Sequence, residues 1–304
     1  MIDISVHNET SELVLVVLGI PFDFGGTPNE LQCYDPKSME HVSNGTFPLE
    51  KDIVGEMHQF LSLLNRYEVE VLRPDNIKGL NQIFCRDIFF VIDETVVIPN
   101  IIKERSKEIE AVSYIFDRIN RLNIVTMPDD ARAEGGDVIL FQDYIFVGYS
   151  NDADFRDYKT ARTNKKGVDF LRDKFPHRQI IPFELNKSDT DARRNALHLD
   201  CCFQPIGKDM ALLYEGGFKK SSDIDFLVSL FSKENIIFLT QEEMYNMYAN
   251  LFSISEKVIV SEKSFSRINA ELNNRGFIVE EIDYSEISKM EGLFRCSTIP
   301  IIRR

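Results

Sequence analysis

The feature that most constrains the fold of this chain is the order of its short apolar strands and amphipathic helices. The order strand, strand, helix, strand recurs roughly five times along the 304 residues. In the second unit, strands predicted at Ile88–Ile92 and Thr95–Pro99 precede a helix at Lys103–Leu122 and a strand at Ile124–Met127. Because the strands come in pairs, the pattern differs from the single strand–helix alternation of a doubly wound sheet. No Gly/Ser-rich linker interrupts it, so we predict one α/β domain over residues 1–304.

Hydrophobic periodicity predicts the other elements of the pattern. The segment Asp52–Tyr67 carries apolar residues at helical spacing, and short apolar runs indicate strands. The helices predicted in this way are Asp52–Tyr67, Asn164–Phe175, Asp223–Phe231 and Ser264–Asn274. The further predicted strands are Leu13–Ile20, Val69–Leu72, Val138–Phe141, Tyr144–Gly148, Gln179–Phe183, Leu199–Pro205, Met210–Tyr214, Ile236–Leu239, Leu251–Ile254, Lys257–Val260 and Phe277–Ile282.

Charge and cysteine usage exclude several classes of function. The net charge is -14 and no run of five or more Lys and Arg residues occurs, which argues against a nucleic-acid partner. The longest apolar stretch, Leu13–Ile20, is too short to cross a membrane. Five cysteines without regular spacing or a CxxC pair suggest neither a disulfide framework nor a zinc site. A reducing cytoplasm is therefore the expected location.

Four polar clusters stand beside the predicted strands, where active sites commonly gather on such scaffolds. They are Cys85–Asp87, Glu134–Asp137, His198–Asp200 and Arg295–Thr298. In a strand, His198 and Asp200 would point to the same face. Each cluster alone has an ordinary structural explanation, because paired glycines make turns and a single cysteine is more often a small buried hydrophobe. The functional case rests on their joint occurrence at equivalent points of a repeated pattern.

Together the clusters meet the needs of chemistry at a guanidinium carbon. A guanidinium is a planar, resonance-stabilised cation, so an enzyme must hold its N–H edges with carboxylates and attack its carbon with a strong nucleophile such as a thiolate. A histidine can serve as general acid and base, and a carboxylate can orient it. A cysteine protease does not need so many carboxylates. The residues that fill these roles are Asp87, Asp200, Glu134, His198 and Cys296.

The same blocks resemble the guanidino-group modifying enzymes of the pentein superfamily, which include arginine deiminases, arginine dihydrolases, dimethylargininases and amidinotransferases. The blocks that carry the resemblance are Asn81–Asp87, Glu134–Asp137, His198–Asp200 and Arg295–Thr298, and they span nearly the whole chain. The family fold is a five-bladed αβ propeller of ββαβ units with pseudo-fivefold symmetry, which agrees with the pattern above. This fold is therefore our prediction.

The resemblance implies a role for each matching residue. Cys296 is similar to the nucleophile that forms a covalent amidino-thioether, and His198 is similar to the family's proton shuttle. Glu134 resembles the carboxylate that orients this histidine. Asp87 and Asp200 resemble the carboxylates that grip the guanidinium.

Three further matches concern the rest of the substrate. Asp137 completes the Glu-Gly-Gly-Asp block and is given a supporting role. Asn81 resembles an asparagine that helps bind the amino-acid end in arginine deiminases. Arg162 resembles an arginine that binds the substrate carboxylate, although the inserted stretch Asn151–Ala161 leaves Arg156 as a rival.

The leading hypothesis is a hydrolase of the guanidinium group of L-arginine or a close analogue, of the deiminase or dihydrolase type. The alternatives are an amidinotransferase and a non-catalytic binding protein on the same fold. The chain lacks the inserted helical bundle of typical deiminases and has no long segment to keep water from the intermediate, which favours hydrolysis. We expect a small guanidino compound as the only partner class, with no metal and no cofactor, and a homo-oligomer is compatible with the sequence.

Overall fold

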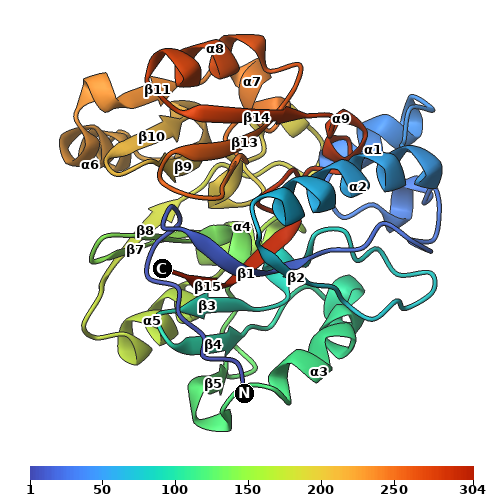
Figure 1. Cartoon of the computed structure of the whole chain (residues 1–304), viewed down its shortest axis with the longest axis horizontal. Helices are drawn as coiled ribbons and strands as arrows, with labels where there is room; N and C mark the ends of the chain where they lie inside the picture. Colours follow the sequence, from blue (N-terminus) through green and yellow to red (C-terminus); the bar gives the residue numbers. More distant parts are fainter.

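The structure of the chain is a computed structural model that describes all residues from 1 to 304. It contains five three-stranded sheets, and in each sheet the middle strand pairs antiparallel with one neighbour and parallel with the other. This arrangement, visible in Figure 1, confirms the predicted five-bladed fold.

The sheets are β15-β1-β2, β3-β4-β5, β6-β7-β8, β11-β10-β9 and β12-β13-β14. Their strands are β1 Leu13–Leu18, β2 Glu70–Leu72, β3 Phe90–Ile92, β4 Thr95–Ile98, β5 Ile124–Thr126, β6 Val138–Phe141, β7 Tyr144–Tyr149, β8 Gln179–Glu184, β9 Phe203–Ile206, β10 Met210–Leu213, β11 Ile236–Phe238, β12 Phe252–Ser253, β13 Val258–Glu262, β14 Ile278–Ile282 and β15 Thr298–Arg303.

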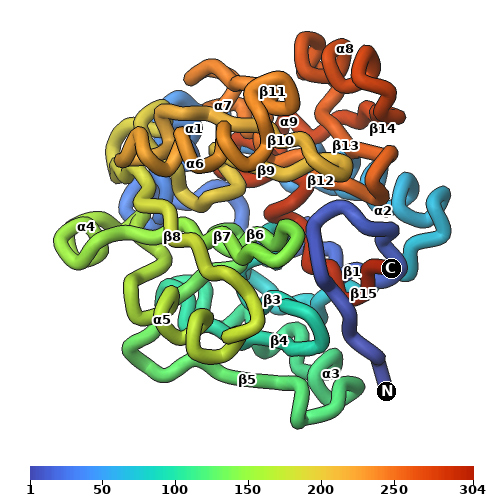
Figure 2. Tube along the Cα trace, turned by 90° about the vertical axis from the view of Figure 1, so that its left-hand side faces the viewer, coloured from blue at the N-terminus to red at the C-terminus, as the bar shows by residue number.

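The two ends of the chain complete one blade together. The last strand, β15, runs antiparallel to the first strand, β1, with Val17 opposite Ile299 and Leu18 opposite Thr298. Figure 2 shows the blue and red ends of the chain side by side. No strand is predicted after Ile282 from the sequence, so β15 is a further strand that the structure adds. This pairing closes the ring of blades and fixes the backbone just after Cys296.

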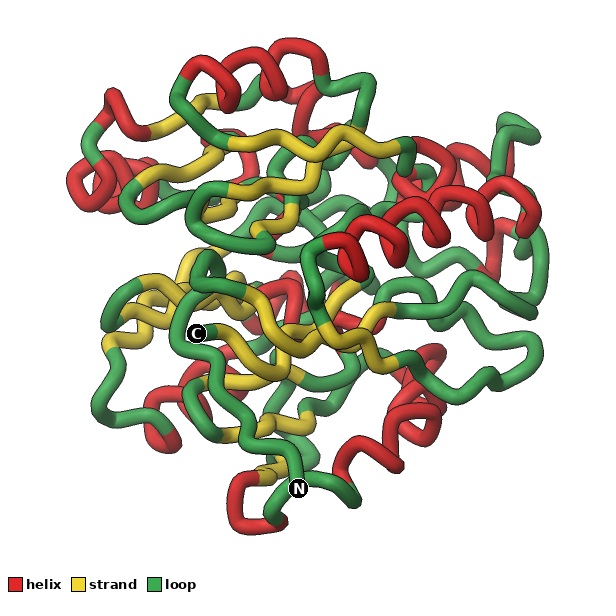
Figure 3. The backbone as a smooth tube through the Cα atoms, viewed as in Figure 1, coloured by secondary structure: helices red, strands yellow, loops and turns green.

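Helices lie mainly around the outside of the sheets, as Figure 3 shows. The longest of them, α2, turns an apolar stripe inward because Ile53, Met57, Phe60 and Leu64 recur at helical spacing. None of the helices is long and apolar enough to cross a membrane. The helices are α1 Pro36–Ser43, α2 Glu50–Arg66, α3 Ser113–Phe116, α4 Asp152–Asp157, α5 Lys165–Lys174, α6 Ser221–Phe231, α7 Gln241–Tyr245, α8 Ser266–Asn274 and α9 Ser285–Ser288.

Two predicted elements are wrong in ways that matter for the site. The segment predicted as one helix, Lys103–Leu122, is a 3-10 segment over Lys103–Val112 followed by the single turn of α3. The charged side chain of Arg105 is turned inward there, where it bonds acidic groups and a backbone carbonyl instead of facing solvent.

The second wrong element is the strand predicted at Leu199–Pro205. Its first half is a 3-10 turn over Leu199–Cys201, and β9 begins only at Phe203. The amide of Leu199 donates to the side chain of Asp137 at 2.9 Å rather than to a neighbouring strand. His198 and Asp200 therefore do not lie in a strand, and the prediction that strand alternation places both side chains on one face is wrong.

We expect Phe60→Ala to lower the free energy of unfolding by about 3–5 kcal/mol, the usual loss for a buried aromatic side chain. Phe60 is fully buried on α2, and its ring packs edge-on against Phe252, Tyr284 and Phe294 with centroids 5.1 to 5.9 Å apart. Denaturant titration measures the change. Leu122→Ala is the control, because Leu122 is 88% exposed and its loss should stay within about 0.5 kcal/mol. Equal effects of the two substitutions would contradict the assignment of this core.

Candidate active site

A small, mostly polar cavity lies where loops from several blades meet. Its wall is formed by the segment before α1, the loop before β3, the 3-10 segment after β4, the loop before α5, the 3-10 turn before β9 and the turn before β15. A second, wider cavity adjoins it and shares part of this wall. The residues that line the small cavity are Tyr34, Asp35, Asn81, Phe84, Asp87, Arg105, Arg162, Leu197, His198, Met290, Glu291 and Cys296.

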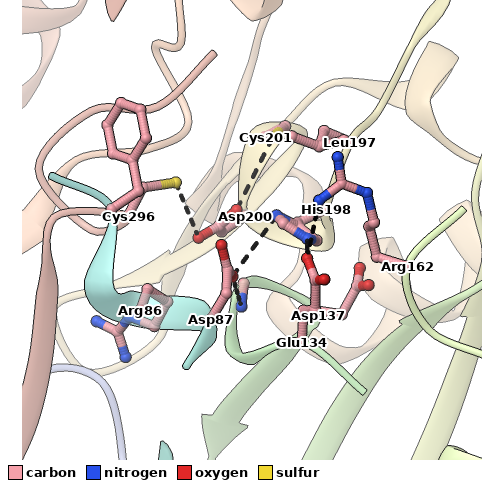
Figure 4. Close-up of polar contacts among 12 residues, drawn as sticks. Arg86, Asp87, Glu134, Asp137, Arg162, Leu197, His198, Asp200, Cys201 and Cys296 are labelled. Atoms are coloured by element: carbon pink, nitrogen blue, oxygen red, sulfur yellow. Dashed lines mark hydrogen bonds and ion pairs between the residues drawn. The ribbon is translucent and has the colours of Figure 1, made fainter. Parts of the chain in front are cut away.

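Cys296 is held in this wall by its own backbone. Its amide donates to the Asn250 side chain at 3.1 Å, and its carbonyl accepts from the Arg86 amide at 3.0 Å. The Cys296 side chain is buried, with its sulfur 3.8 Å from an oxygen of Asp200 (Figure 4). Burial, together with the negative charges of Asp200 and Asp87, raises the pKa of the Cys296 thiol well above its ordinary value. These surroundings therefore favour the thiol over the thiolate.

The carboxylate of Asp200 stands between the thiol and a buried arginine. The oxygen that faces Cys296 also accepts from Arg295 at 2.8 Å. Arg295 is fully buried and bonds Glu9 at 3.0 Å and the Val138 carbonyl at 2.8 Å. These bonds fix Asp200 beside the thiol.

His198 lies between two carboxylates. Its Nε2 is 2.8 Å from Glu134, and its Nδ1 is 3.8 Å from Asp87. Burial alone would lower the pKa of His198, but the charge of Asp87 and the hydrogen bond to Glu134 raise it above the ordinary value. The two carboxylates therefore hold the ring in place and favour its protonated form.

Glu134 is kept ionised by its other partners. It accepts from Arg162 at 3.1 Å and from the Ile102 amide at 3.2 Å. Although burial opposes ionisation, Arg162 and His198 hold the pKa of Glu134 well below its usual range. A permanently charged Glu134 fixes both the orientation and the charge of the His198 ring.

Asp87 has the same kind of support on the opposite side of the ring. One oxygen accepts from the Gly136 amide at 3.0 Å, and the other accepts from Arg105 at 2.6 Å. Arg105 also bonds Glu108 with two nitrogens, at 2.8 and 2.9 Å. Asp87 is thus fixed at the cavity wall with one oxygen toward His198.

The two glycines of the Glu-Gly-Gly-Asp block are required by close approach. A Cβ on Gly135 would lie 2.1 Å from the Arg86 carbonyl oxygen, and a Cβ on Gly136 would lie 2.7 Å from Nδ1 of His198. Asp137 lies behind them, where it accepts from Thr163 at 2.6 Å and from the Leu199 amide at 2.9 Å. It does not line the cavity and instead joins three loops beneath it.

The three residues matched to the rest of the substrate lie in different surroundings. Asn81 and Arg162 line the cavity. Each nitrogen of Arg162 already donates a bond, to Lys159, Glu134 and Tyr34. Arg156 is 74% exposed on α4 and pairs with its neighbour Asp157, so it does not reach the cavity.

Several side chains that build the site were not singled out from the sequence. Arg105 stands in a charged segment that was predicted as an exposed helix, and Asn250 stands in an unremarkable loop. Asp35 and Glu291 are isolated acidic residues in turns. Only Glu291 had a local signal, because it precedes the Arg-Cys-Ser-Thr block by a few residues.

One group of side chains has the proximity that a metal ion requires. Ligand atoms of Asp87, Glu134 and His198 lie within 4.8 Å of one another, and all three residues are buried. The imidazole nitrogen and the carboxylate oxygens already bond each other or an arginine. The hydrogen-bonded arrangement accounts for their proximity.

We expect Gly136→Ala to lower the free energy of unfolding by about 1–3 kcal/mol, because a methyl group there overlaps the imidazole of His198. The matched control is Gly55→Ala on the exposed side of α2, where an added Cβ meets nothing within 4 Å. That substitution should stabilise the protein by about 0.4–1 kcal/mol. Thermal or denaturant unfolding compares the two, and a neutral Gly136→Ala would contradict the close packing of the ring.

We expect the imidazole of His198 to remain protonated above pH 6.5, because Asp87 and Glu134 raise its pKa. Protonation then stabilises the fold fully below the unfolded pKa of about 6.5, and this stabilisation is lost as the pH rises through the folded pKa. Glu134→Gln removes the bond at 2.8 Å and should lower the pKa. Histidine NMR titration measures both values, with His198→Asn used to assign the signal. A pKa at or below 6.5 in the native protein would disprove this description.

Comparison with known proteins identifies the family. The family model for "N,N dimethylarginine dimethylhydrolase, eukaryotic" matches residues 48–303. An uncharacterised protein of Bacillus subtilis, YkgA, is 32% identical over 244 residues, which make up 77% of this chain and 78% of YkgA.

Solved structures share the fold at low sequence identity. ArgZ, an arginine dihydrolase from the ornithine–ammonia cycle in cyanobacteria, matches with a TM-score of 0.78 and 18% identity over 96% of this chain; the match spans 41% of ArgZ. Its N-terminal domain alone is covered to 98%. SxtG, an amidinotransferase from Microseira wollei in the saxitoxin biosynthetic pathway, matches with a TM-score of 0.78 and 15% identity over 99% of this chain and 98% of SxtG. Because the family model covers most of the sequence, this chain belongs to the N,N-dimethylarginine dimethylhydrolase family, within the guanidino-group modifying enzymes of the pentein superfamily.

Proposed function

We propose that this protein is a cysteine-dependent hydrolase of the guanidinium group of L-arginine or a close analogue, including N-methylated arginines. The observation that carries the proposal is that the thiol of Cys296, the imidazole of His198 and the fixed carboxylate of Asp87 line one cavity, with Asp200 beside the thiol just outside the lining. The reaction would pass through a covalent amidino-thioether on Cys296.

Binding of the substrate would also activate the nucleophile. We propose that the planar cation lies between Asp87 and Asp200, the two carboxylates whose charges raise the pKa of Cys296. A positive charge at that position favours the thiolate, because it offsets the repulsion between the sulfur and these carboxylates. When a cation is bound, the thiol proton of Cys296 would therefore pass to solvent and leave the thiolate.

The first half of the reaction forms the thioether. The sulfur of Cys296 attacks the guanidinium carbon, and the π electrons of that carbon move onto nitrogen. His198 then donates its proton to the leaving nitrogen, the C–N bond breaks, and the amine departs as a neutral molecule. The buried pair of Glu134 and Arg162 keeps the ring oriented during this transfer.

The second half consumes water. The neutral His198 takes a proton from water, and the hydroxide oxygen attacks the amidino carbon. The C–S bond breaks, the electron pair returns to the sulfur of Cys296, and the proton of the new hydroxyl group passes to that sulfur, so the neutral ureido product and the thiol form together. From arginine the first cycle gives citrulline and ammonia, and a second attack on the bound ureido product would give ornithine. An N-methylated arginine would release a methylamine instead of ammonia.

The remaining part of the substrate would extend past Asn81 and Arg162. We propose that Arg162 binds the substrate carboxylate, because it lines the cavity and retains N–H groups beyond those that already donate. The exposure of Arg156 on α4 argues against the rival assignment.

Amidino transfer to an amine remains the second candidate, because SxtG matches the whole chain with the same TM-score as ArgZ. Transfer and hydrolysis share the first intermediate and differ in what attacks it. A non-catalytic binding protein is the third candidate, but it would have no use for a thiol beside fixed carboxylates.

We expect Cys296→Ala to reduce turnover of arginine or methylated arginine by at least about a thousandfold, as removal of a nucleophile does. The protein should remain folded, because the substitution removes one sulfur atom and leaves the backbone bonds of residue 296 in place. Steady-state kinetics measures the loss, and mass analysis of rapidly quenched wild-type enzyme detects the adduct. Cys33→Ser is the control for a thiol outside this wall. Substantial turnover by Cys296→Ala would refute the assignment.

We expect the oxygen of the ureido product to come from water. Reaction in isotopically labelled water, followed by mass analysis of the product, measures this directly. Incorporation of the label supports hydrolysis. A product that forms only when an amine acceptor is added, and that carries no label, would instead establish an amidinotransferase.

A further inference from the structure

Glu9 is a buried acidic residue that the proposed mechanism does not use. It lies in the segment before β1, is 6% exposed, and does not line the cavity that contains Cys296. Its Oε1 accepts from Arg295 at 3.0 Å and from the Leu140 amide at 3.4 Å, and its Oε2 accepts from Arg295 at 3.3 Å. The carboxylate of Glu9 therefore binds one edge of the Arg295 guanidinium with both oxygens.

The remaining terminal nitrogen of the same guanidinium binds Asp200. Nη1 of Arg295 donates at 2.8 Å to the Asp200 oxygen that also lies 3.8 Å from the sulfur of Cys296 (Figure 4). Glu9, Arg295, Asp200 and Cys296 thus form one series of contacts from the segment before β1 to the candidate nucleophile. All four are buried, so salt in the solvent screens the charges along this series only weakly.

Glu9 also faces two further buried arginines. Arg86 and Arg303 are at most 4% exposed, and neither has a carboxylate oxygen within the 4.0 Å of a salt bridge. Together with Arg295 they form a group of three buried guanidiniums, the arginine cluster. Although burial opposes ionisation, the charges of this cluster lower the pKa of Glu9 to about 2. Glu9 and Asp200 are the acidic groups that counter the charges of the cluster.

We propose that Glu9 is a positioning residue of the active site, which acts through Arg295 and sets how much negative charge Asp200 presents to Cys296 and to a bound cation. The inference rests on the proposed function for the identity of that cation, and it adds a residue that controls how tightly the cation binds. With Glu9 in place, part of the charge of Arg295 is compensated from the side away from the cavity. Without Glu9, Asp200 would face the arginine cluster alone, and the site would become more positive.

A more positive site has two opposite effects, which distinguish this role from simple support of the fold. A guanidinium binds less tightly there, whereas the thiolate of Cys296 becomes more stable. The charged groups that act on this thiol are Asp200, Asp87 and Arg295. A change in how Arg295 is compensated therefore reaches the sulfur directly.

The first measurement is the pH profile of Cys296 alkylation by iodoacetamide, a neutral reagent, followed by mass analysis of the peptide that carries this residue. Glu9→Gln retains the size of the side chain and an oxygen that can accept from Arg295, but it removes the charge. We expect its profile to move to lower pH by about half a unit to one and a half units, the effect of a single buried charge across several ångströms of protein.

Two variants serve as controls for this shift. Glu9→Asp retains the charge and shortens the side chain, so its profile should stay closer to that of the wild type. Glu12→Gln removes the same charge from an exposed position in the same segment and should not move the profile. An unchanged profile for Glu9→Gln, or equal shifts for Glu9→Gln and Glu9→Asp, would overturn the proposal, because the charge of Glu9 would then have no role of its own.

Steady-state kinetics measures the opposite effect on the cation. Glu9→Gln should raise KM for arginine by about threefold to thirtyfold, which is the same shift expressed as a ratio of affinities. Glu9→Asp should raise it less, and Glu12→Gln should leave it unchanged. A lower KM for arginine together with a lower alkylation pH would contradict the electrostatic argument.

A second pair of variants makes the test independent of the folding of Glu9→Gln. Arg303→Met is compared with the double variant that also carries Glu9→Gln, and the double variant removes one charge of each sign from the buried group. Its alkylation profile should lie about half a unit to one and a half units below that of Arg303→Met. Coincident profiles would overturn the proposal.

Failure of the proposed function has a separate signature, which is the absence of turnover of arginine and methylated arginines by the wild type. The alkylation profiles require no substrate, so they decide the role of Glu9 in that case as well. A shift in Glu9→Gln that is absent from Glu12→Gln and smaller in Glu9→Asp would uphold it, and coincident profiles of all four proteins would refute it.

Discussion

The structure depends most on one buried guanidinium, that of Arg295. It bonds Glu9 near the start of the chain, Asp200 beside β9 and the Val138 carbonyl in β6, so it joins segments from three parts of the ring next to the thiol. An unpaired charge at this depth would cost several kcal/mol, and loss of either acidic partner should therefore be strongly destabilising. The candidate nucleophile follows Arg295 directly in sequence, so the interaction that joins these three segments also positions the backbone that carries its sulfur.

Two other carboxylates near the cavity are also paired with a buried arginine. Arg105 holds Asp87 with one nitrogen at 2.6 Å, and Arg162 holds Glu134 with one nitrogen at 3.1 Å. Hydrophobic packing alone cannot fix the direction of a carboxylate, because apolar contacts have no preferred orientation. Pairing each carboxylate with its own arginine keeps it charged and aimed while it is out of water.

Sequence reasoning predicted the parts of this molecule that depend on repeated local pattern. The ββαβ order, the five blades and the family resemblance are confirmed. These features could be predicted because strand periodicity, helix periodicity and each of the four blocks involve residues that are close together in the sequence. It missed β15, whose partner β1 lies at the other end of the chain. It was wrong about Lys103–Leu122 because Arg105 forms buried ion pairs that no local periodicity reveals. Asp35 and Glu291 escaped notice for the same reason, since only the folded chain brings them to one wall.

The charges of the site also suggest how choice of substrate and reactivity are coupled. Burial and two carboxylates favour the protonated form of Cys296, and a thiol is a poorer nucleophile than a thiolate. A neutral group of the same shape, such as the ureido group of the first product, would offset less of that charge, so an attack at its carbon should be slower than the attack at a guanidinium. A guanidinium supplies the compensating charge at the position where its carbon can be attacked. In the proposed reaction the Cys296 thiolate is therefore generated by the group on which it acts, and the discrimination between cation and neutral analogue appears in the chemical step as well as in binding.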